Sequence, residues 1–318
     1  MKFNSTTLLF KTMIIMGMMI SLSSSNWIML WSGLELMLMA FIPIMNSMNK
    51  MYSESAMKYF IMQSISSALL MMSILTSLTM MDNKILMTAA MLIKLAIAPV
   101  NMWFISAMDG VSVNMLMTML ITMKIIPMMI MSYMNLKMNT IIIISLMTSA
   151  ILIMNQTSMK KIIGHSSVFN FTLMLSVVSI SSMWMSYLLI YSLLTWSIIN
   201  MMKTIKIKFI NQLLINEQSK LIKLNLWILM LSFMGMPPLL GFLNKLMVFE
   251  MMLLSKDYTL LLIMIISSMS MTFSYMRMSY SSMIMLSMKT KWTSLINKKK
   301  LKIMWINMIN LISFMYTM

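Results

Sequence analysis

Four charged side chains lie inside stretches of sequence that are otherwise apolar for the length of a membrane span: Glu35, Lys94, Lys124 and Lys245. A charge at the centre of a bilayer costs about 2.5–3.5 kcal/mol on insertion scales, so such residues usually face the interior of a helix bundle and mark ion or proton pathways. A lysine can also load or release a proton when its surroundings change. The four residues therefore predict a protein that moves protons or ions.

The composition restricts what else this chain does. It has 318 residues, of which 60% are hydrophobic and 10% charged, and the apolar residues form long runs typical of an all-α, polytopic membrane protein. Cysteine is absent and His165 is the only histidine, which excludes iron–sulfur clusters held by cysteine and haem held by paired histidines. No glycine-rich nucleotide motif occurs. We expect no bound metal or cofactor and no complete active site, with His165 at a polar helix start or in a loop.

Apolar runs of about 20 residues predict eleven spans in a single membrane domain of residues 1–318. They cover approximately residues 8–23, 27–45, 59–80, 85–104, 113–133, 138–154, 166–181, 183–202, 224–254, 258–284 and 302–317. With the sides alternating from the N-terminus, seventeen lysines fall on the N-terminal side and only Lys84, Lys137 and Lys256 on the other. This positive-inside pattern places the N-terminus in the matrix or cytoplasm and the C-terminus opposite. It also explains the net charge of +17 without nucleic-acid binding.

Prolines interrupt two of these spans, at Pro99 in the fourth and at Pro237 and Pro238 in the ninth. Each is the fourth member of a five-helix set, residues 8–133 and 138–284, with 302–317 as an extra C-terminal span. Because five is odd, the second set would run inverted relative to the first. Paired broken helices in inverted repeats indicate a transport site at mid-membrane. Two ordinary proline kinks are the alternative interpretation.

Each buried charge also has a structural interpretation. Glu35 and Lys94 are expected to pair, either as a static ion pair or as a carboxylate that tunes the lysine. Lys124 lies near mid-depth just before Pro127, which favours a proton carrier. Lys245 is closer to the lysine-poor face, where its side chain could instead extend to the interface.

Several local strings occur in an order that resembles the chain 2 family of antiporter-like subunits in mitochondrial NADH:ubiquinone oxidoreductase, respiratory complex I. They are 31–35 (WSGLE), Lys94 followed by 98–99 (AP) and 103–104 (WF), 124–127 (KIIP), 155–161 (NQTSMKK) and 236–245 (MPPLLGFLNK). The 56 methionines and the scarcity of arginine also look like a mitochondrial, arthropod-like composition. Where the family often has histidines, this chain has Asn101 and Asn170, which we interpret as possible hydration residues.

The resemblance implies proton translocation through a relay of Glu35 with Lys94, Lys124 and Lys245. It implies a multi-pass protein of the mitochondrial inner membrane, with NADH, FMN, iron–sulfur clusters and ubiquinone bound by other subunits of the complex. Its implied partners are the other membrane-arm subunits, namely antiporter-like chain 4 and small membrane chains, and inner-membrane lipid such as cardiolipin. Two alternatives remain: a standalone cation/proton antiporter, and a structural scaffold whose charges are static pairs.

Overall fold

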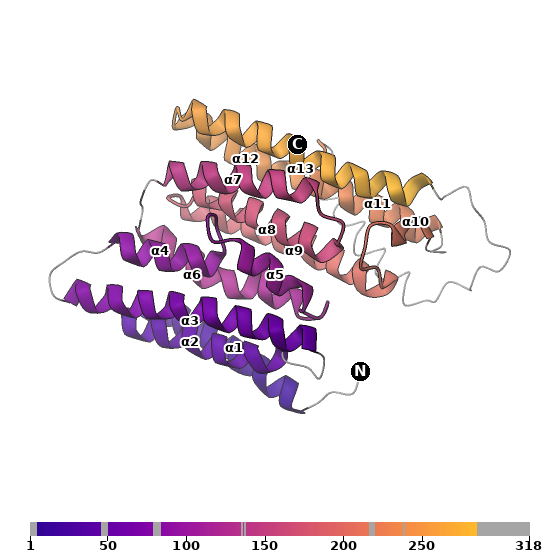
Figure 1. Ribbon diagram of the computed structural model, residues 1–318. Helices are drawn as coiled ribbons and strands as arrows, with labels where there is room; N and C mark the ends of the chain where they lie inside the picture. Colours follow the sequence, from indigo (N-terminus) through magenta and orange to yellow (C-terminus); the bar gives the residue numbers. More distant parts are fainter. Residues whose placement is uncertain are drawn as a thin grey trace. The chain divides into compact units, whose positions relative to one another are not determined.

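The computed structural model describes residues 5–45, 50–78, 84–134, 136, 138–215, 220–237 and 239–284. Pro238 and the predicted span 302–317 lie outside the described residues. Over these ranges the regular secondary structure is helical, apart from one isolated bridge between Ser158 and Phe209 (Figure 1). The chain divides into two compact units, Met1–Lys137 and Met138–Met318.

The first unit contains six α-helices and a turn of π-helix in its described part. They are α1 (Ser5–Ser23), α2 (Trp27–Met45), α3 (Lys50–Leu78), α4 (Lys84–Leu95), α5 (Met102–Asp109), the π-helix η1 (Thr118–Thr122) and α6 (Met123–Met134). Helix α3 packs against α2, α4 and α5, and α6 packs against α4 and α1. The Pro99 interruption thus separates α4 from α5, as expected.

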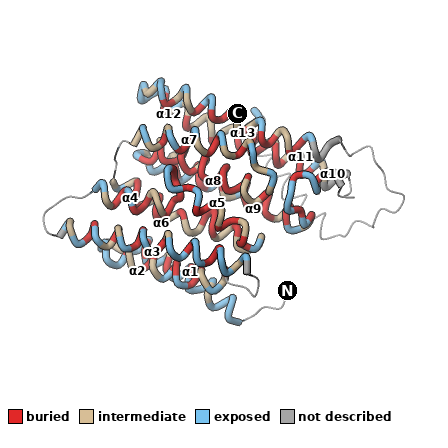
Figure 2. The backbone as a smooth tube through the Cα atoms, viewed as in Figure 1, coloured by how far each residue is buried: buried red, intermediate tan, exposed pale blue. Residues whose placement is uncertain are grey.

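The second unit contains seven α-helices in its described part. They are α7 (Asn139–Met154), α8 (Met159–Ser176), α9 (Ser181–Ile205), α10 (Gln212–Ile215), α11 (Lys220–Met234), α12 (Leu240–Leu254) and α13 (Tyr258–Ile284). Helix α8 contacts α7, α9 and α12 and is buried along most of its length (Figure 2). The second interruption separates α11 from α12.

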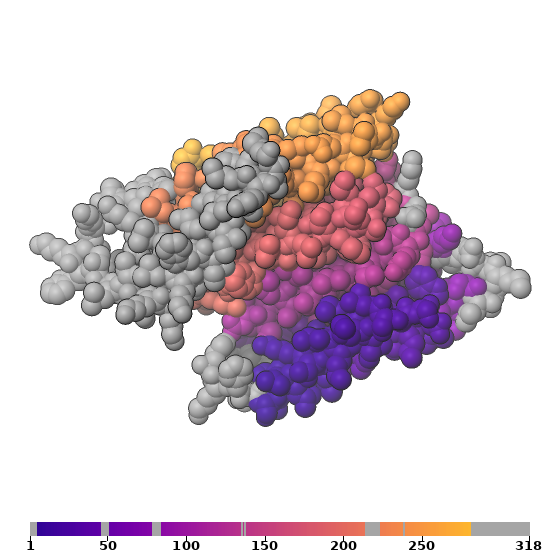
Figure 3. Space-filling view, turned by 180° about the vertical axis from the view of Figure 1, so that it is seen from behind, coloured from indigo at the N-terminus to yellow at the C-terminus, as the bar shows by residue number. Residues whose placement is uncertain are grey.

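The exterior of the helices is apolar, as membrane-spanning helices require. Among the described residues, α1, α2, α3, α9 and α13 are long and apolar enough to cross a bilayer. Helix α1 exposes Leu8, Leu9, Ile15, Met16 and Met19, and the N-terminal part of the chain forms the indigo surface in Figure 3. Exposed apolar surface on this scale suits lipid contact rather than water. The chain is therefore an all-helical, multi-pass membrane protein.

Two glycines let α1 and α2 approach closely. A Cβ atom on Gly33 would lie 2.7 Å from the carbonyl oxygen of Gly17 and 2.9 Å from Cβ of Ser21. A Cβ atom on Gly17 would lie 2.8 Å from the carbonyl oxygen of Gly33. Small residues at helix interfaces allow such backbone contact in membranes. Because Gly33 is two residues before Glu35, this contact also fixes the helix face that carries the carboxylate.

We expect Gly33→Val to force α1 and α2 apart and to destabilise the fold by about 1–3 kcal/mol, the usual effect of overpacking. The measurement is the thermal stability of the detergent-solubilised protein. Leu36→Val is the matched control, because Leu36 lies on the same helix and is 45% exposed. Equal stability of the two variants would contradict a tight α1–α2 contact.

Candidate functional site

The break after α4 is a defined helix end rather than an irregular kink. Ala96 has a left-handed backbone, with φ of 60°. Its N–H donates to the carbonyl of Ile93 at 3.0 Å, and the N–H of Ile97 donates to Leu92 at 3.1 Å. This pair of bonds is a Schellman motif, which closes a helix C-terminus. Lys94 lies in the last turn, where the partial negative charge of the helix end favours a cation.

Glu35 and Lys94 interact electrostatically within this unit. Lys94 is only 5% exposed, and the charge of Glu35 acts on its ammonium group. Oε2 of Glu35 is itself buried and makes no hydrogen bond to a described residue. The carboxylate thus acts on Lys94 through its charge, while its Oε2 atom has no fixed donor among the described side chains. This arrangement suits a carboxylate that modulates the lysine.

Lys124 has a different environment. It is 1% exposed, and its Nζ atom lies 4.1 Å from the centroid of the Phe104 ring on α5. An ammonium group over an aromatic face is stabilised by the ring quadrupole, most strongly away from water. Lys124 is the second residue of α6, directly after the π-helix η1. Single π-helical turns occur often at functional sites because they redirect side chains.

Phe104 belongs to a row of aromatic rings across three helices of this unit. Phe104 contacts Trp103 at a centroid distance of 5.8 Å, Trp103 contacts Tyr59 at 6.0 Å, and Tyr59 contacts Phe41 at 5.1 Å. Offset and edge-to-face pairs of this kind hold rings in fixed orientations. The row therefore holds in place the ring against which Lys124 lies.

The break in the second unit has the same form. Gly235 is left-handed, with φ of +78°, and its N–H donates to Ser232 while the N–H of Met236 donates to Leu231. Nζ of Lys245 donates a 2.6 Å hydrogen bond to the carbonyl of Met234, the last residue of α11. A charged donor makes a strong bond to a free helix-end carbonyl. Lys245 thus points back to the break rather than only toward the interface.

The prolines also lie in the same register at both breaks. Pro99 is four residues after Leu95, and Pro238 is four residues after Met234. The structure describes Pro237, which is exposed, at the second break. Both helix ends therefore combine a left-handed residue with a lysine nearby, and in the sequence a proline follows each left-handed residue three positions later.

Asn101 and Asn170, the two asparagines expected to bind water, both lie in the interior of their units. Asn101 is 3% exposed, directly before α5, and its Nδ2 atom has no hydrogen-bond partner among the described residues. Asn170 is half-buried on α8, where its Nδ2 donates to Ser166 and its Oδ1 accepts a 2.7 Å bond from the hydroxyl of Tyr187. Sequence reasoning missed Tyr187, although its spacing of four from Tyr191 on an apolar helix was an available signal.

The expected position of His165 was wrong. Helix α8 begins at Met159, seven residues before the predicted span, so His165 lies in its second turn and is 1% exposed. Its Nδ1 atom is buried with no hydrogen-bond partner among the described residues. The polar residues from Lys160 to Ser167 led us to begin the predicted span too late. Neighbouring helices bury this part of α8, although its own sequence is not strongly apolar.

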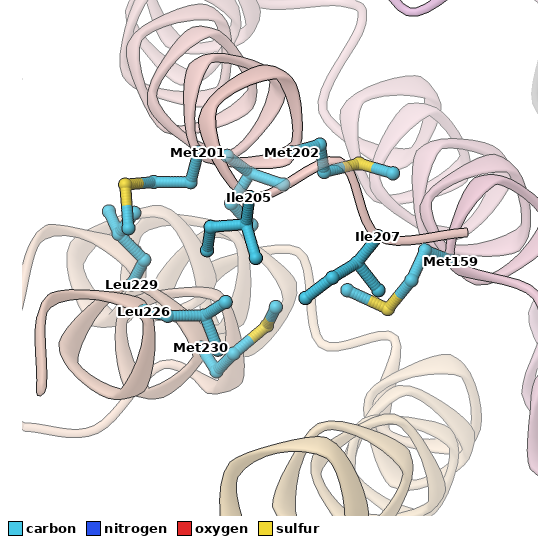
Figure 4. Close-up of a pocket in the computed structure, with 9 residues that line it drawn as sticks. Met159, Met201, Met202, Ile205, Ile207, Leu226, Leu229 and Met230 are labelled. Carbon is cyan, nitrogen blue, oxygen red and sulfur yellow. The ribbon is translucent and has the colours of Figure 1, made fainter. Parts of the chain in front are cut away.

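An apolar hollow in the second unit is lined by no titratable side chain among the described residues. Met159, Met201, Ile205, Ile207 and Leu229 are among the residues that line it, and the lining consists of methionine, isoleucine and leucine (Figure 4). No group of three or more His, Cys, Asp or Glu side chains that could hold a metal occurs in the described part of the chain. The candidate site therefore consists of the buried lysines and their surroundings.

Comparison with known proteins identifies the family. The sequence profile of the NADH:quinone oxidoreductase/Mrp antiporter transmembrane family matches residues 24–83 and 74–274. The chain belongs to this family. It is 37% identical to NADH-ubiquinone oxidoreductase chain 2 of Locusta migratoria, covering 94% of this chain and 91% of the relative. It is 33% identical to the same protein of Anopheles gambiae, covering 89% and 88%. The resemblance expected from the sequence is confirmed.

Two solved membrane-complex chains have the same fold. A chain of respiratory complex I from Thermus thermophilus superposes with a TM-score of 0.84 over 98% of this chain and 78% of that chain, at 17% identity. A chain of the Mrp complex from Dietzia superposes with a TM-score of 0.78 over 90% of this chain and 62% of that chain, at 12% identity. The fold is thus shared at low sequence identity.

We expect Gly241→Ala to open the second break. A Cβ atom at Gly241 would lie 1.7 Å from the carbonyl oxygen of Ser232, so the start of α12 would have to move away from the end of α11. The bond between Lys245 and Met234 would lengthen, and the backbone amides of residues 235, 236 and 239–242 would exchange hydrogen faster, as measured by mass spectrometry. Leu253→Ala, at a 54% exposed position of α12, is the control. Unchanged exchange in Gly241→Ala would contradict the close contact.

Proposed function

We propose that this chain is a membrane-arm subunit of mitochondrial respiratory complex I and that it translocates protons through Glu35, Lys94, Lys124 and Lys245. Redox energy comes from NADH oxidation and ubiquinone reduction in other subunits, which bind the FMN, iron–sulfur clusters and quinone. The observation that carries the proposal is the burial of Lys94 and Lys124 inside a helical membrane protein of this family. Buried lysines in a bilayer are costly and are kept for transport.

The surroundings of the lysines suit proton transfer better than a purely structural role. Lys94 is next to a helix end and under the influence of Glu35, Lys124 lies over Phe104, and Lys245 donates to Met234. The three ammonium groups on the proposed path are therefore stabilised by three different groups, namely a carboxylate, an aromatic ring and a backbone carbonyl. In the scaffold alternative each lysine would need one fixed anionic partner, whereas the carbonyl of Met234 stabilises the Lys245 ammonium as a dipole without neutralising it.

We propose that the two units are inverted repeats, with boundaries near residues 8–133 and 138–284. The same neighbour pattern within each unit supports this. In the first unit, α1 packs on α2, α2 on α3, α3 on both halves of the broken helix, and α6 on α4 and α1. In the second, α7 packs on α8, α8 on α9, α9 on both α11 and α12, and α13 on α11 and α7. The matching helix ends at Ala96 and Gly235 support the same correspondence.

The number of spans and the sides of the two termini complete the proposed topology. Eleven spans, with the N-terminus in the mitochondrial matrix and the C-terminus in the intermembrane space, follow from the lysine distribution and the odd repeat length. Neighbours in the arm would be antiporter-like chain 4, small membrane chains and anionic inner-membrane lipid such as cardiolipin, which the lysine-rich side would attract.

A standalone antiporter is the second candidate, because an Mrp complex shares this fold. Purification distinguishes the two. A subunit of complex I purifies with NADH:ubiquinone oxidoreductase activity in one large assembly. A chain that is isolated alone and exchanges cations for protons in liposomes would overturn our choice.

We predict that Lys94→Met in the assembled complex lowers proton pumping and coupled NADH:ubiquinone turnover together, by at least about tenfold, since losing a carrier raises the barrier by about 1.4 kcal/mol or more. Glu35→Gln should lower both less, because a modulating charge is lost rather than a carrier. Both rates are measured in proteoliposomes at equal complex content.

The matched control is Lys84→Met, which removes an exposed lysine from the same helix and should leave both rates unchanged. Full pumping by an assembled Lys94→Met complex would contradict the relay proposal.

A further inference from the structure

Helix α8 carries buried polar groups toward two neighbouring helices. His165, Ser166, Ser167 and Thr172 are all at most 1% exposed, and the helix is buried on nearly every side. A helix buried all round is normally apolar, because each buried polar atom must find a partner. The hydroxyls of Ser166 and Ser167 donate to backbone carbonyls of their own helix, which leaves their oxygen lone pairs available as acceptors.

Three buried tyrosines gather beside these serines. Tyr187 and Tyr191 on α9 are 1% and 2% exposed, and Tyr275 on α13 is 2% exposed. Tyr275 lies within electrostatic range of both other hydroxyls, next to Ser166, while Tyr191 lies next to Ser167. Five hydroxyl groups from α8, α9 and α13 thus form one cluster in the core of the second unit.

The tyrosines differ in how their hydroxyls are held. The Tyr187 hydroxyl donates to Oδ1 of Asn170 at 2.7 Å, so its orientation is fixed. The hydroxyls of Tyr191 and Tyr275 are buried, and each has only a weak interaction with one serine of α8, Tyr191 with Ser167 and Tyr275 with Ser166. Leaving a buried hydroxyl without a firm partner costs about 1–3 kcal/mol. Phenylalanine would fill the same space without that cost, so packing alone does not account for these two hydroxyls.

We infer that Tyr191 and Tyr275, with Ser166 and Ser167 beside them, pass protons through the core of the second unit, while Tyr187 held by Asn170 positions the cluster. The role in pumping rests on the proposed function. At each step a new O–H bond forms on the accepting hydroxyl as its own O–H bond breaks, so every hydroxyl ends neutral and one proton has moved. An asparagine amide does not exchange protons in this way at neutral pH.

The cluster also lies along the helices that contact the Lys245 segment. Helix α12 packs against α8, α9 and α13, the three helices that carry the hydroxyls. Asn244, next to Lys245, is 3% exposed and its Oδ1 has no hydrogen-bond partner among the described residues. The geometry therefore joins the hydroxyl cluster and the second broken helix within one unit.

The test is Tyr275→Phe and Tyr191→Phe in the intact complex, with Tyr280→Phe as the matched control. Tyr280 lies on α13, as Tyr275 does, but is 59% exposed. We expect each buried variant to lower pumping and coupled turnover about fivefold, as for a proton step that loses a hydrogen-bonded hydroxyl. We also expect a larger solvent deuterium isotope effect on turnover, which a purely structural loss would not produce. The control should match the parent protein in pumping, in coupled turnover and in the isotope effect.

Lys94→Met, measured in parallel, distinguishes failure of the hydroxyl cluster from failure of the proposed function. Slow pumping in Lys94→Met with normal rates and isotope effect in both tyrosine variants would overturn the hydroxyl cluster alone. Normal pumping in all three would overturn the proposed function as well. If a tyrosine variant assembles poorly, the isotope effect on the assembled fraction decides: an unchanged effect overturns the inference, and an increased effect supports it.

Discussion

A lysine ammonium group inside an apolar helix bundle needs nearby negative charge or partial charge, and this chain supplies it mainly by ending helices inside the bundle. Free carbonyls at a helix C-terminus carry partial negative charge. Lys94 lies in the last turn of α4, and Lys245 donates to Met234 at the end of α11. The broken helices therefore bring backbone carbonyls to bear on both lysines, and Glu35 adds its charge at Lys94.

The helix ends themselves depend on small residues. Gly235 takes the left-handed conformation at little cost, whereas Ala96 takes it at a cost of about 1–2 kcal/mol. Gly241 lets α12 begin against the end of α11, and Gly33 lets α2 approach α1 beside Glu35. In a chain with only six glycines, these positions are among those where the backbone comes close to a neighbour or turns sharply.

Hydropathy and proline placement predict much of this fold from the sequence. The runs at 27–45, 138–154 and 258–284 match α2, α7 and α13 closely, because continuous apolar sequence and helix coincide there. Prediction failed where burial comes from neighbouring helices: α8 begins at Met159, in a polar string that holds His165. The contact of Lys124 with Phe104 and the tyrosine cluster are tertiary contacts, which no local pattern specifies.

The central claim can be tested at Lys124, the buried lysine that lies over the Phe104 ring. The most direct measurement is the number of protons pumped per NADH oxidised, together with turnover, in proteoliposomes that contain assembled Lys124→Met complex. Lys256→Met, which removes an exposed lysine at a helix end, is the comparison. A carrier role for Lys124 predicts that pumping and turnover fall together while the comparison variant stays normal. An assembled Lys124→Met complex with full turnover and an unchanged proton yield would contradict the account.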